Sequence, residues 1–389
     1  MGTFACTNSR NSTFVPVVGL SFFAIASGFL MSLIPLSLQS FGLSLTLTPW
    51  LASIFYLGLL IGSLQIEGVV ARIGHRLAFI LFLSVLLLTI FLMIAMPSAA
   101  TWLAARFIAG IAVAGVFVVV ESWLLMADTA KQRAKRLGLY MTSLYGGNAL
   151  GQLGLVPIGV EGIFPYSVVI GVLLIAILPP LLIKAGQPDC TGHQKIRFAE
   201  LKALSRPAIL GCLVSGMLMA PIYGLMPLYI KAQTGSAEQT GMLMAIIILG
   251  GMLVQPIVSY LSPKMSKTLL MSLFCLVGLL GVIGILKAHN SVLLNSSYML
   301  LGASVFSLYP VAISLACDSL GVSKIVAATE IMLLSYSAGS VAGPVLAQGF
   351  KHYNNGLIMY LGVCMLTMCI YMLIKTATSK PSDHSAIPQ

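Results

Sequence analysis

Long apolar runs separated by short polar breaks follow one another along the whole chain. A helix that crosses the hydrocarbon core of a bilayer needs about 20 apolar residues, and runs of this kind recur throughout. The twelve candidate segments are 14–38, 49–70, 78–96, 101–125, 137–160, 166–183, 208–230, 240–261, 268–287, 292–316, 325–350 and 356–374. Polar breaks such as Pro97-Ser98 are too short to hold a folded domain. The pattern therefore predicts an all-α polytopic membrane protein with 12 transmembrane helices.

The composition excludes a protein that is surrounded by water. Of the 389 residues, 58% are hydrophobic and only 8% are charged, whereas soluble domains carry about 25% charged residues. A soluble enzyme, a disulfide scaffold and a nucleic-acid-binding protein are therefore excluded, and the lipid bilayer is the expected partner. The seven cysteines form no close pair with the spacing of metal ligands, so we expect no metal ion and no cofactor.

The positions of Lys and Arg predict the orientation of the chain. Cytoplasmic connections of membrane proteins carry an excess of these residues. With the N-terminus inside, 17 of the 21 Lys and Arg residues fall in the inside segments, and only Lys231, Lys287 and Lys351 fall outside. We therefore expect a multi-pass integral membrane protein with both termini cytoplasmic, in a bacterial inner membrane.

An internal repeat relates the two halves of the chain at a fixed offset of 192 residues. The matching pairs include Leu33-Ile34-Pro35-Leu36 with Leu225-Met226-Pro227-Leu228, Leu57-Gly58 with Leu249-Gly250, Gly147 with Gly339, and Gly151 with Gly343. The repeat predicts two pseudo-symmetric six-helix bundles, at 1–183 and 208–389, joined by a cytoplasmic linker at 184–207. Parallel repeats of this kind enclose a substrate site between them in membrane transporters.

Several short motifs add a family resemblance to this picture. They include Arg106-Phe107-Ile108-Ala109-Gly110 and Val118-Val119-Val120-Glu121-Ser122 in the fourth segment, Leu308-Tyr309-Pro310-Val311-Ala312 in the tenth, and Leu333-Leu334-Ser335-Tyr336 in the eleventh. With them the chain resembles the major facilitator superfamily over essentially its whole length, and its YcaD-type branch in particular. The resemblance implies the major facilitator fold and transport by alternating access.

The resemblance extends in part to the superfamily's inner-loop signature between the second and third segments. Ala71 stands where that signature has Asp, and Pro263 stands there in the repeat. The resemblance implies a role for this loop and its repeat in gating. The candidate gating residues are Glu67, Arg72, Gly74, Arg76, Lys264 and Lys267.

Two ionisable residues lie inside the fourth segment, where a charge costs about 2.5–3.5 kcal/mol on insertion scales. Arg106 and Glu121 are fifteen residues apart, about 22 Å along a helix, so they cannot pair directly. They share one stripe of the helix with Gly110 and Phe117, which we expect to face a cavity. Arg106 either anchors an anionic or carbonyl group, pairs with a helix end in the outer leaflet, or extends to the outer interface.

Glu121 is open to two interpretations. As a proton carrier, its carboxyl group would bind and release a proton in a partly dehydrated pocket. As a structural group, it would hold the adjacent basic loop by hydrogen bonds. Glu330 in the eleventh segment is the second candidate for proton coupling.

Polar residues on the fifth and eleventh segments fall at matching positions. Tyr145 and Asn148 become Ser337 and Ser340 when 192 is added, so both segments should present a polar face to one shared site. The complete set of cavity candidates is Arg106, Phe117, Tyr145, Asn148, Gln152, Tyr309, Tyr336, Ser337 and Ser340.

Among the functional classes, a secondary active transporter fits these features best. Proton-coupled efflux of an amphipathic metabolite or drug is the leading prediction, because the expected lining is rich in Met and aromatic residues and sparsely charged. Proton-coupled uptake of a small solute is the alternative. A membrane-embedded enzyme would need a His, Asp and Glu cluster, but the five histidines lie in loops and tails. We expect a monomer with a small-molecule substrate, H+ as coupling ion and no enzymatic activity.

Overall fold

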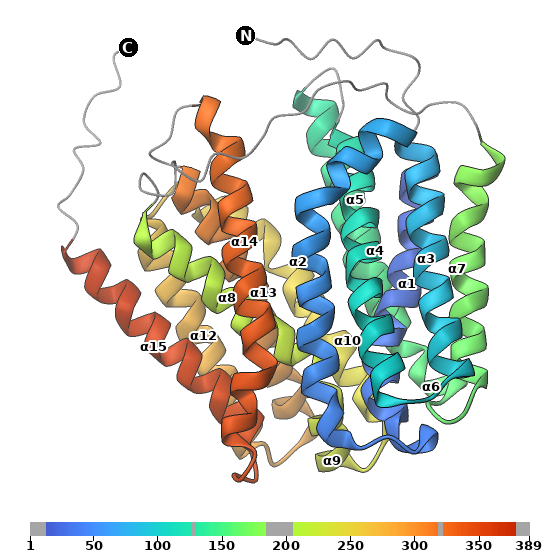
Figure 1. The fold of residues 1–389 in the computed structure, drawn as a ribbon. Coiled ribbons are helices and arrows are strands. Elements are labelled where there is room, and N and C mark those ends of the chain that lie inside the picture. The colour runs from blue at the N-terminus through green and yellow to red at the C-terminus, as the bar shows by residue number, and fades with distance from the viewer. Residues whose placement is uncertain (1–12, 126–129, 184–204, 318–321, 379–389) are drawn as a thin grey trace.

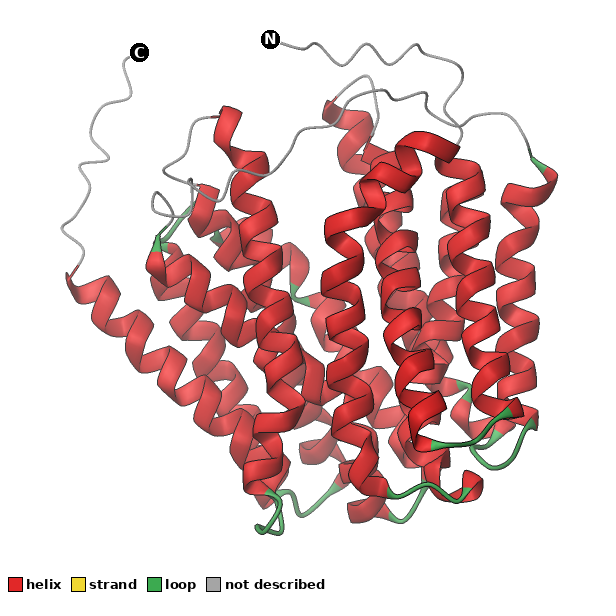
Figure 2. Cartoon of the chain, viewed as in Figure 1, coloured by secondary structure: helices red, strands yellow, loops and turns green. Residues whose placement is uncertain are grey.

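The computed structural model describes residues 13–125, 130–183, 205–317 and 322–378, and all regular structure in these ranges is helical (Figures 1 and 2). The first half holds α1 (Phe14–Ser37), α2 (Thr48–Ile73), α3 (His75–Ala95), α4 (Ala99–Leu125), α5 (Ala130–Leu153), α6 (Leu155–Ile158) and α7 (Phe164–Leu182). The second half holds α8 (Arg206–Gly224), α9 (Met226–Thr234), α10 (Ala237–Leu253), α11 (Gln255–Leu261), α12 (Lys267–Lys287), α13 (Ser291–Cys317), α14 (Val322–Ala347) and α15 (Gly356–Thr378). The linker expected at 184–207 lies largely outside the described residues.

Every segment predicted to cross the membrane is occupied by helix. Among the described residues, eleven helical segments are long and apolar enough to cross a bilayer. The remaining predicted segment, 137–160, corresponds to α5 and the short α6. This segment is not apolar enough to be counted, because α5 has Lys131, Gln132 and Arg133 directly after its first residue, Ala130, and carries further polar residues along its length.

Two further predicted segments are also divided into two helices. The seventh is α8 followed by α9, and the eighth is α10 followed by α11. Each second helix has proline at its second position, Pro227 in α9 and Pro256 in α11. Proline lacks the backbone N–H and disfavours helical geometry in the residue before it, so the helix is interrupted at these points.

The helices form two groups that lie side by side, α1 to α7 in one and α8 to α15 in the other (Figure 1). One cluster of buried apolar side chains is drawn from residues between Val15 and Ala176. The other is drawn from residues between Ala208 and Met372, with Ala149 of α5 added from the first group. Each group of helices therefore has its own apolar interior.

The offset of 192 residues reappears in the contacts between helices. Gly58 of α2 lies against the backbone of Phe107 in α4, and Gly250 of α10 lies against the backbone of Met299 in α13. The same backbone contacts relate Gly110 on Phe55 to Gly302 on Ile247, and Gly147 on Ser21 to Gly339 on Leu213. Side-chain contacts also repeat, since Gly19 lies against the side chain of Phe79 and Gly211 against that of Met271. The internal repeat is therefore present in the way the helices pack, and not only in the residue types.

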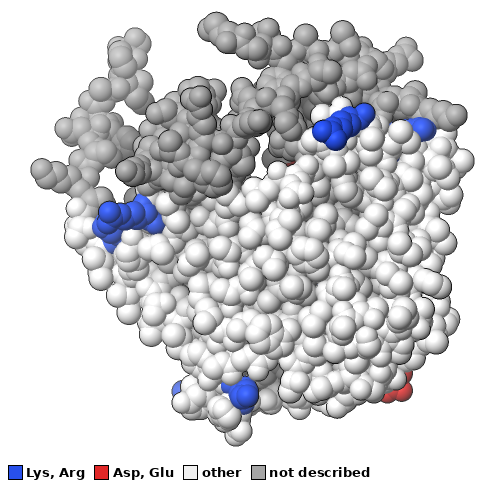
Figure 3. Space-filling view, viewed as in Figure 1, with Lys and Arg blue, Asp and Glu red and all other residues white. Residues whose placement is uncertain are grey.

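Large apolar side chains cover the outside of the molecule. Phe164 is 66% exposed and Leu280 is 62% exposed, which would be unfavourable in water. On the face drawn in Figure 3, the described Lys and Arg residues lie near the upper and lower edges, with an uncharged band between them. This band has the character expected of a surface that contacts lipid.

The glycine contacts generate a matched test of packing. A Cβ on Gly147 would lie 2.6 Å from the Cβ of Ala24, whereas a Cβ on the neighbouring Gly146 would meet nothing within 4 Å. We expect Gly147→Ala to destabilise the protein by about 1–3 kcal/mol through overpacking. Gly146→Ala gains the same helix propensity without the clash and should not lower stability. Thermal unfolding of both variants in detergent measures the difference, and equal unfolding temperatures would contradict the tight α1–α5 contact.

Candidate functional site

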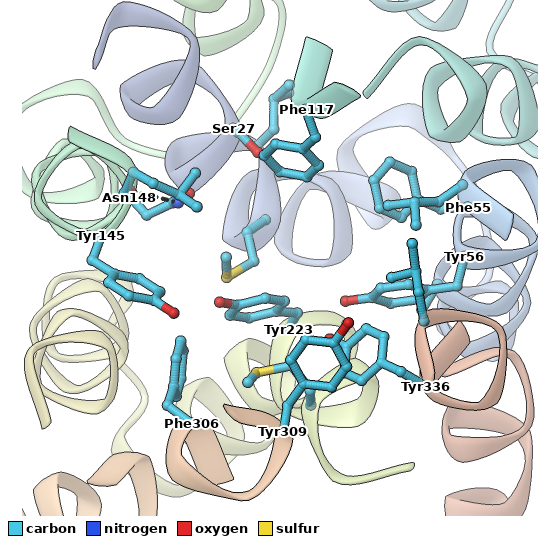
Figure 4. Close-up of a pocket in the computed structure, with 18 of the residues that line it drawn as sticks. Ser27, Phe55, Tyr56, Phe117, Tyr145, Asn148, Tyr223, Phe306, Tyr309 and Tyr336 are labelled. Atoms are coloured by element: carbon cyan, nitrogen blue, oxygen red, sulfur yellow. Dashed lines mark hydrogen bonds between the residues drawn. The ribbon is translucent and has the colours of Figure 1, made fainter. Parts of the chain in front are cut away.

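A cavity of about 870 Å³ lies between the two groups of helices. Its wall is formed by α1, α2, α4 and α5 on one side and by α8, α13 and α14 on the other, with single residues from α3 and α11. Figure 4 shows aromatic side chains from both groups around the open centre. The cavity is large enough for a drug-sized molecule, since ligand pockets typically measure about 300–1,000 Å³.

The cavity is closed at the end where α2 and α4 begin. There Gly224 of α8 packs so closely on Ala52 of α2 that an added Cβ would lie 2.5 Å from the Cβ of Ala52. Gly241, near the start of α10, lies against the backbone carbonyl of Gln152 in α5. At the opposite end, Glu121 and Met141 line the cavity with exposed side chains. Within the described residues, the cavity is therefore open toward the end of α4.

The lining follows the internal repeat, but the two halves carry different chemistry. Three lining positions of the first half are apolar, and the residues 192 further on, also in the lining, are tyrosines. The pairs are Met31 with Tyr223, Phe117 with Tyr309, and Leu144 with Tyr336. Both charged lining residues, Arg106 and Glu121, come from the first half. The repeat therefore supplies a symmetric frame with an asymmetric surface.

Aromatic rings contact one another across the boundary between the halves. The ring centroids of Tyr145 in α5 and Phe306 in α13 are 5.5 Å apart, and those of Tyr223 and Phe306 are 6.1 Å apart. Tyr309 and Tyr336 pack at 4.8 Å. The hydroxyl groups of Tyr145, Tyr223 and Tyr309 point into the cavity (Figure 4). The wall thus offers flat apolar faces with hydroxyl groups between them.

Arg106 lies in the first third of α4, near the closed end of the cavity. Its guanidinium carbon is 4.1 Å from the centroid of the Phe55 ring, which is cation–π geometry. Its Nε atom is buried and has no hydrogen-bond partner among the described residues. The sequence alone leaves three roles open for Arg106. Its place in the cavity wall is compatible with the role of an anchor for a substrate group.

Glu121 lies in the last two turns of α4, at the open end. Its Oε1 accepts a hydrogen bond of 2.7 Å from the hydroxyl of Tyr140 in α5. The next residue, Ser122, is within hydrogen-bonding distance of His75 at the start of α3, with 3.0 Å between Oγ and Nε2. Glu121 therefore combines a defined hydrogen bond with direct access to the cavity. Glu330 lies in α14, and its side chain is outside the described part of the structure.

Six of the nine cavity candidates lie in the lining, namely Arg106, Phe117, Tyr145, Asn148, Tyr309 and Tyr336. The other three, Gln152, Ser337 and Ser340, do not line the cavity and are fully buried between helices. The amide of Gln152 donates to the carbonyl oxygen of Gly28 at 2.6 Å, and its Oε1 accepts from Ser32 at 2.6 Å. These placements correct the sequence-based expectation.

Neighbouring glycines explain why these polar residues are covered. Gly151 brings the backbone of α1 close to α5, so the adjacent Gln152 is enclosed by α1. Gly339 brings α8 close to α14 in the same way, next to Ser340. Where two helix backbones approach closely, side chains beside the contact are buried.

The candidate gating residues lie at the ends of helices. Arg72 is in the last turn of α2, Arg76 is in the first turn of α3, and Gly74, with φ of 79°, is the single residue between these helices. In the repeat, the ammonium group of Lys264 is 3.4 Å from the ring centroid of Tyr260, and Lys267 begins α12. The side chain of Glu67 in α2 is outside the described part of the structure.

Several lining residues do not stand out in the sequence as candidates for the cavity. They are aromatic or mildly polar residues without a charge, among them Phe55, Tyr56, Tyr140, Tyr223 and Phe306. A usable signal exists on α2, where Thr48, Ala52, Phe55 and Leu59 recur at helical spacing and all line the cavity.

These features define a class of protein. Two similarly packed groups of membrane helices around a central cavity, closed at one end and open at the other, form a secondary transporter. The family model described as Major Facilitator Superfamily matches residues 17–344, and the chain belongs to this superfamily. It is therefore a multi-pass membrane transporter and not an enzyme.

The chain is similar to curated relatives and to a solved structure. It is 30% identical over 371 residues to the uncharacterized MFS-type transporter YcaD of Escherichia coli O9:H4 (strain HS), covering 94% of this chain and 96% of that protein. The same values apply to YcaD of Escherichia coli strain K12 / DH10B. The crystal structure of a mutant of the nucleoside transporter NupG matches with a TM-score of 0.74 at 11% identity, covering 92% of this chain and 96% of that chain. That likeness supports the fold alone.

The division between lining and buried residues is testable by thiol labelling. In a variant without native cysteines, cysteine at Tyr309 or Met141 should react with a small polar thiol reagent in detergent, because both side chains reach the cavity. Cysteine at Ser337 or Ser340 should be protected, since both positions are fully buried. Mass spectrometry of the labelled protein gives the extent of reaction. Rapid labelling at Ser337 would contradict this arrangement of α14.

Proposed function

We propose that the chain is a proton-coupled exporter of an amphipathic metabolite or drug. The main support is the cavity of about 870 Å³, whose wall is aromatic and aliphatic and holds one carboxylate and one guanidinium group. Such a wall suits a substrate that is partly apolar and partly polar. Proton-coupled uptake of a small solute is the second candidate, because the same cavity chemistry serves either direction.

Transport would proceed by rocking of the two helix bundles, 1–183 and 208–389, about the cavity, with 184–207 as their cytoplasmic linker. The side toward which the cavity opens holds the helix ends with Arg72, Arg76 and Lys267. The sequence assigns 17 of the 21 Lys and Arg residues to this side, and the positive-inside rule then makes it cytoplasmic. The conformation is then inward-facing, with both termini in the cytoplasm of a bacterial cell and the protein in its inner membrane. The helix-end residues Arg72, Arg76, Lys264 and Lys267 would form the inner gate of a monomeric transporter.

Glu121 is the leading candidate for the proton carrier. An ionisable group inside a membrane segment is costly, and its presence points to a functional role. Glu121 lines the cavity with an exposed side chain, so it can exchange a proton with water in this state. Its hydrogen bond from Tyr140 links α4 with α5 and would tie the protonation state to the arrangement of these helices. Glu330 is the second candidate.

Orientation is testable with an impermeant maleimide on intact cells. In a Cys-free background, cysteines placed at Lys231, Lys287 and Lys351 should be labelled, because these positions belong to the outer side. Cysteines at Arg133 and Lys324 should be labelled only after the membrane is permeabilised. Labelling of Arg133→Cys in intact cells would overturn the proposed orientation.

Proton coupling is testable by substitution of the carboxyl group. Glu121→Gln keeps the shape and hydrogen-bonding capacity of the side chain but removes the titratable group. It should abolish accumulation of substrate driven by a pH gradient in liposomes, while substrate binding and exchange without a gradient persist. The matched control is Glu238→Gln in the first turn of α10, which should transport like the wild type.

Other results of this experiment would change which residue is assigned as the proton carrier. Gradient-driven transport that survives Glu121→Gln would make Glu121 structural and pass the role of carrier to Glu330. If the double variant Glu121→Gln and Glu330→Gln also retains it, proton coupling through these groups is wrong.

A further inference from the structure

We propose that the cavity recognises amphipathic organic anions, with an aromatic body held among the aromatic side chains of the wall and an acidic group bound by Arg106. The proposal rests on the proposed transport function and adds to it the chemical class of the substrate. It follows from four observations: a guanidinium without a counter-charge among the described residues, hydrogen-bond donors that face the centre of the cavity, the separation of the two charges along α4, and the ring contacts of the wall.

Arg106 is a cation whose counter-charge is not supplied by the described protein. Its guanidinium is stacked on the Phe55 ring at 4.1 Å, and its buried Nε has no hydrogen-bond partner among the described residues. An uncompensated charge in a region of low dielectric constant is unfavourable. A carboxylate, sulfonate or phosphate group of a ligand would pair with the planar guanidinium in a bidentate manner and remove this cost.

The remaining polar groups of the wall also favour a ligand that accepts hydrogen bonds. The hydroxyl groups of Tyr145, Tyr223 and Tyr309 point into the cavity, and each can donate to a ligand (Figure 4). The carboxylate of Glu121 already accepts the hydrogen bond of Tyr140. Arg106 and the tyrosines thus make the inner part of the cavity richer in donors than in charged acceptors.

The side-chain amides of the wall offer a ligand only uncharged hydrogen-bond acceptors. Asn148 donates its N–H to the carbonyl oxygen of Leu144 at 2.8 Å, and Gln255 donates to the carbonyl oxygens of Gly251 and Phe306 at 3.1 and 3.3 Å. Their side-chain oxygens can therefore accept from hydroxyl or amide groups on the body of a ligand. Neither oxygen provides the negative charge that a cationic ligand would need.

The positions of the charges set the direction in which a ligand lies. Arg106 belongs to the closed end, and Glu121 lies fifteen residues further along α4, about 22 Å away. A ligand with one acidic group and a body of one or two rings would contact Arg106 and the tyrosines without approaching the carboxylate. A cationic ligand could pair only with Glu121 at the open end, and Arg106 would repel it from the inner part of the cavity.

The aromatic wall accounts for the second part of the ligand. Tyr309 and Tyr336 pack at 4.8 Å between centroids, and Tyr145, Tyr223 and Phe306 form a continuous set of ring contacts. Offset and edge-on ring contacts stabilise aromatic pairs beyond the burial of apolar area. A planar ring placed among these five residues would gain such contacts on more than one side.

Three ligands with the same aromatic body provide a direct test. Naphthalene-2-acetate carries a negative charge, naphthalene-2-acetamide is its neutral isostere, and 2-(naphthalen-2-yl)ethylamine carries a positive charge. Binding of each to the purified, full-length protein in lipid nanodiscs is measured by calorimetric titration, with empty nanodiscs subtracted. The proposal predicts that the carboxylate binds at least about tenfold more tightly than the amide, as expected for hydrogen bonds to a charged group. It predicts weaker binding still for the amine.

Variants then assign the preference to Arg106. Arg106→Gln should reduce the ratio of carboxylate to amide affinity to about one, and Arg106→Lys should retain part of it because the charge remains but the planar fork is lost. Lys287→Gln at the end of α12 removes a cation outside the cavity and should leave the ratio unchanged. Tyr309→Phe keeps the aromatic ring and should preserve the order of affinities among the three ligands. The unfolding temperature of each variant shows that it is folded.

The alternative outcomes are decisive. A preference for the amine, or an unchanged ratio in folded Arg106→Gln, would overturn the anion proposal, and so would the failure of all three ligands to bind. The transport proposal is tested separately by the internal pH of liposomes on addition of each of the three compounds, which rises when an incoming compound is exchanged for an outgoing proton. Anion binding without any transport would refute the transport function and leave the site assignment standing. Proton-linked transport of neutral or cationic compounds alone would refute the anion class and leave the transport function standing.

Discussion

The close approach of helix backbones at glycine is the constraint on which the rest of the structure depends. A bilayer offers no water to satisfy backbone polar groups, so the spanning segments must be helices. Helices surrounded by lipid gain little from apolar burial against one another and associate through close packing. Gly58 on Phe107 and Gly147 on Ser21 provide such packing in the first half, and their counterparts 192 residues later provide it in the second. Two similar frames result.

The symmetry of the frames and the asymmetry of their lining serve different purposes. Equivalent helices of the two halves meet around one cavity, as alternating access by rocking of the halves would require. Substrate recognition requires different groups on the two sides. The first half supplies the two charges, whereas the second places Tyr223, Tyr309 and Tyr336 where the first has apolar residues. A ligand in the cavity would therefore contact charged groups on one side only and hydroxyl-bearing aromatic rings on both sides.

The sequence predicted the helices and their repeat because both depend on local properties, namely run length and fixed spacing. It also placed Arg106, Glu121 and Tyr309 in the lining, since charge and aromatic character inside apolar segments are conspicuous. It failed for Gln152, Ser337 and Ser340, which are enclosed by neighbouring helices. Which face of a helix is covered depends on where another backbone approaches, and this information lies in glycine contacts between distant segments.

The charge of the substrate bears on the direction of transport. In a cell whose interior is electrically negative, an anion that leaves gains about 2.3 kcal/mol per charge for each 100 mV of membrane potential. An anion that enters has to overcome the same amount. A cavity that binds its ligand through Arg106 would therefore need little further energy for export, and proton entry through Glu121 would add to the driving force. For import of the same ligand, proton entry would have to release more free energy than the membrane potential costs the anion. The positive charge at the closed end of the cavity thus supports export over uptake.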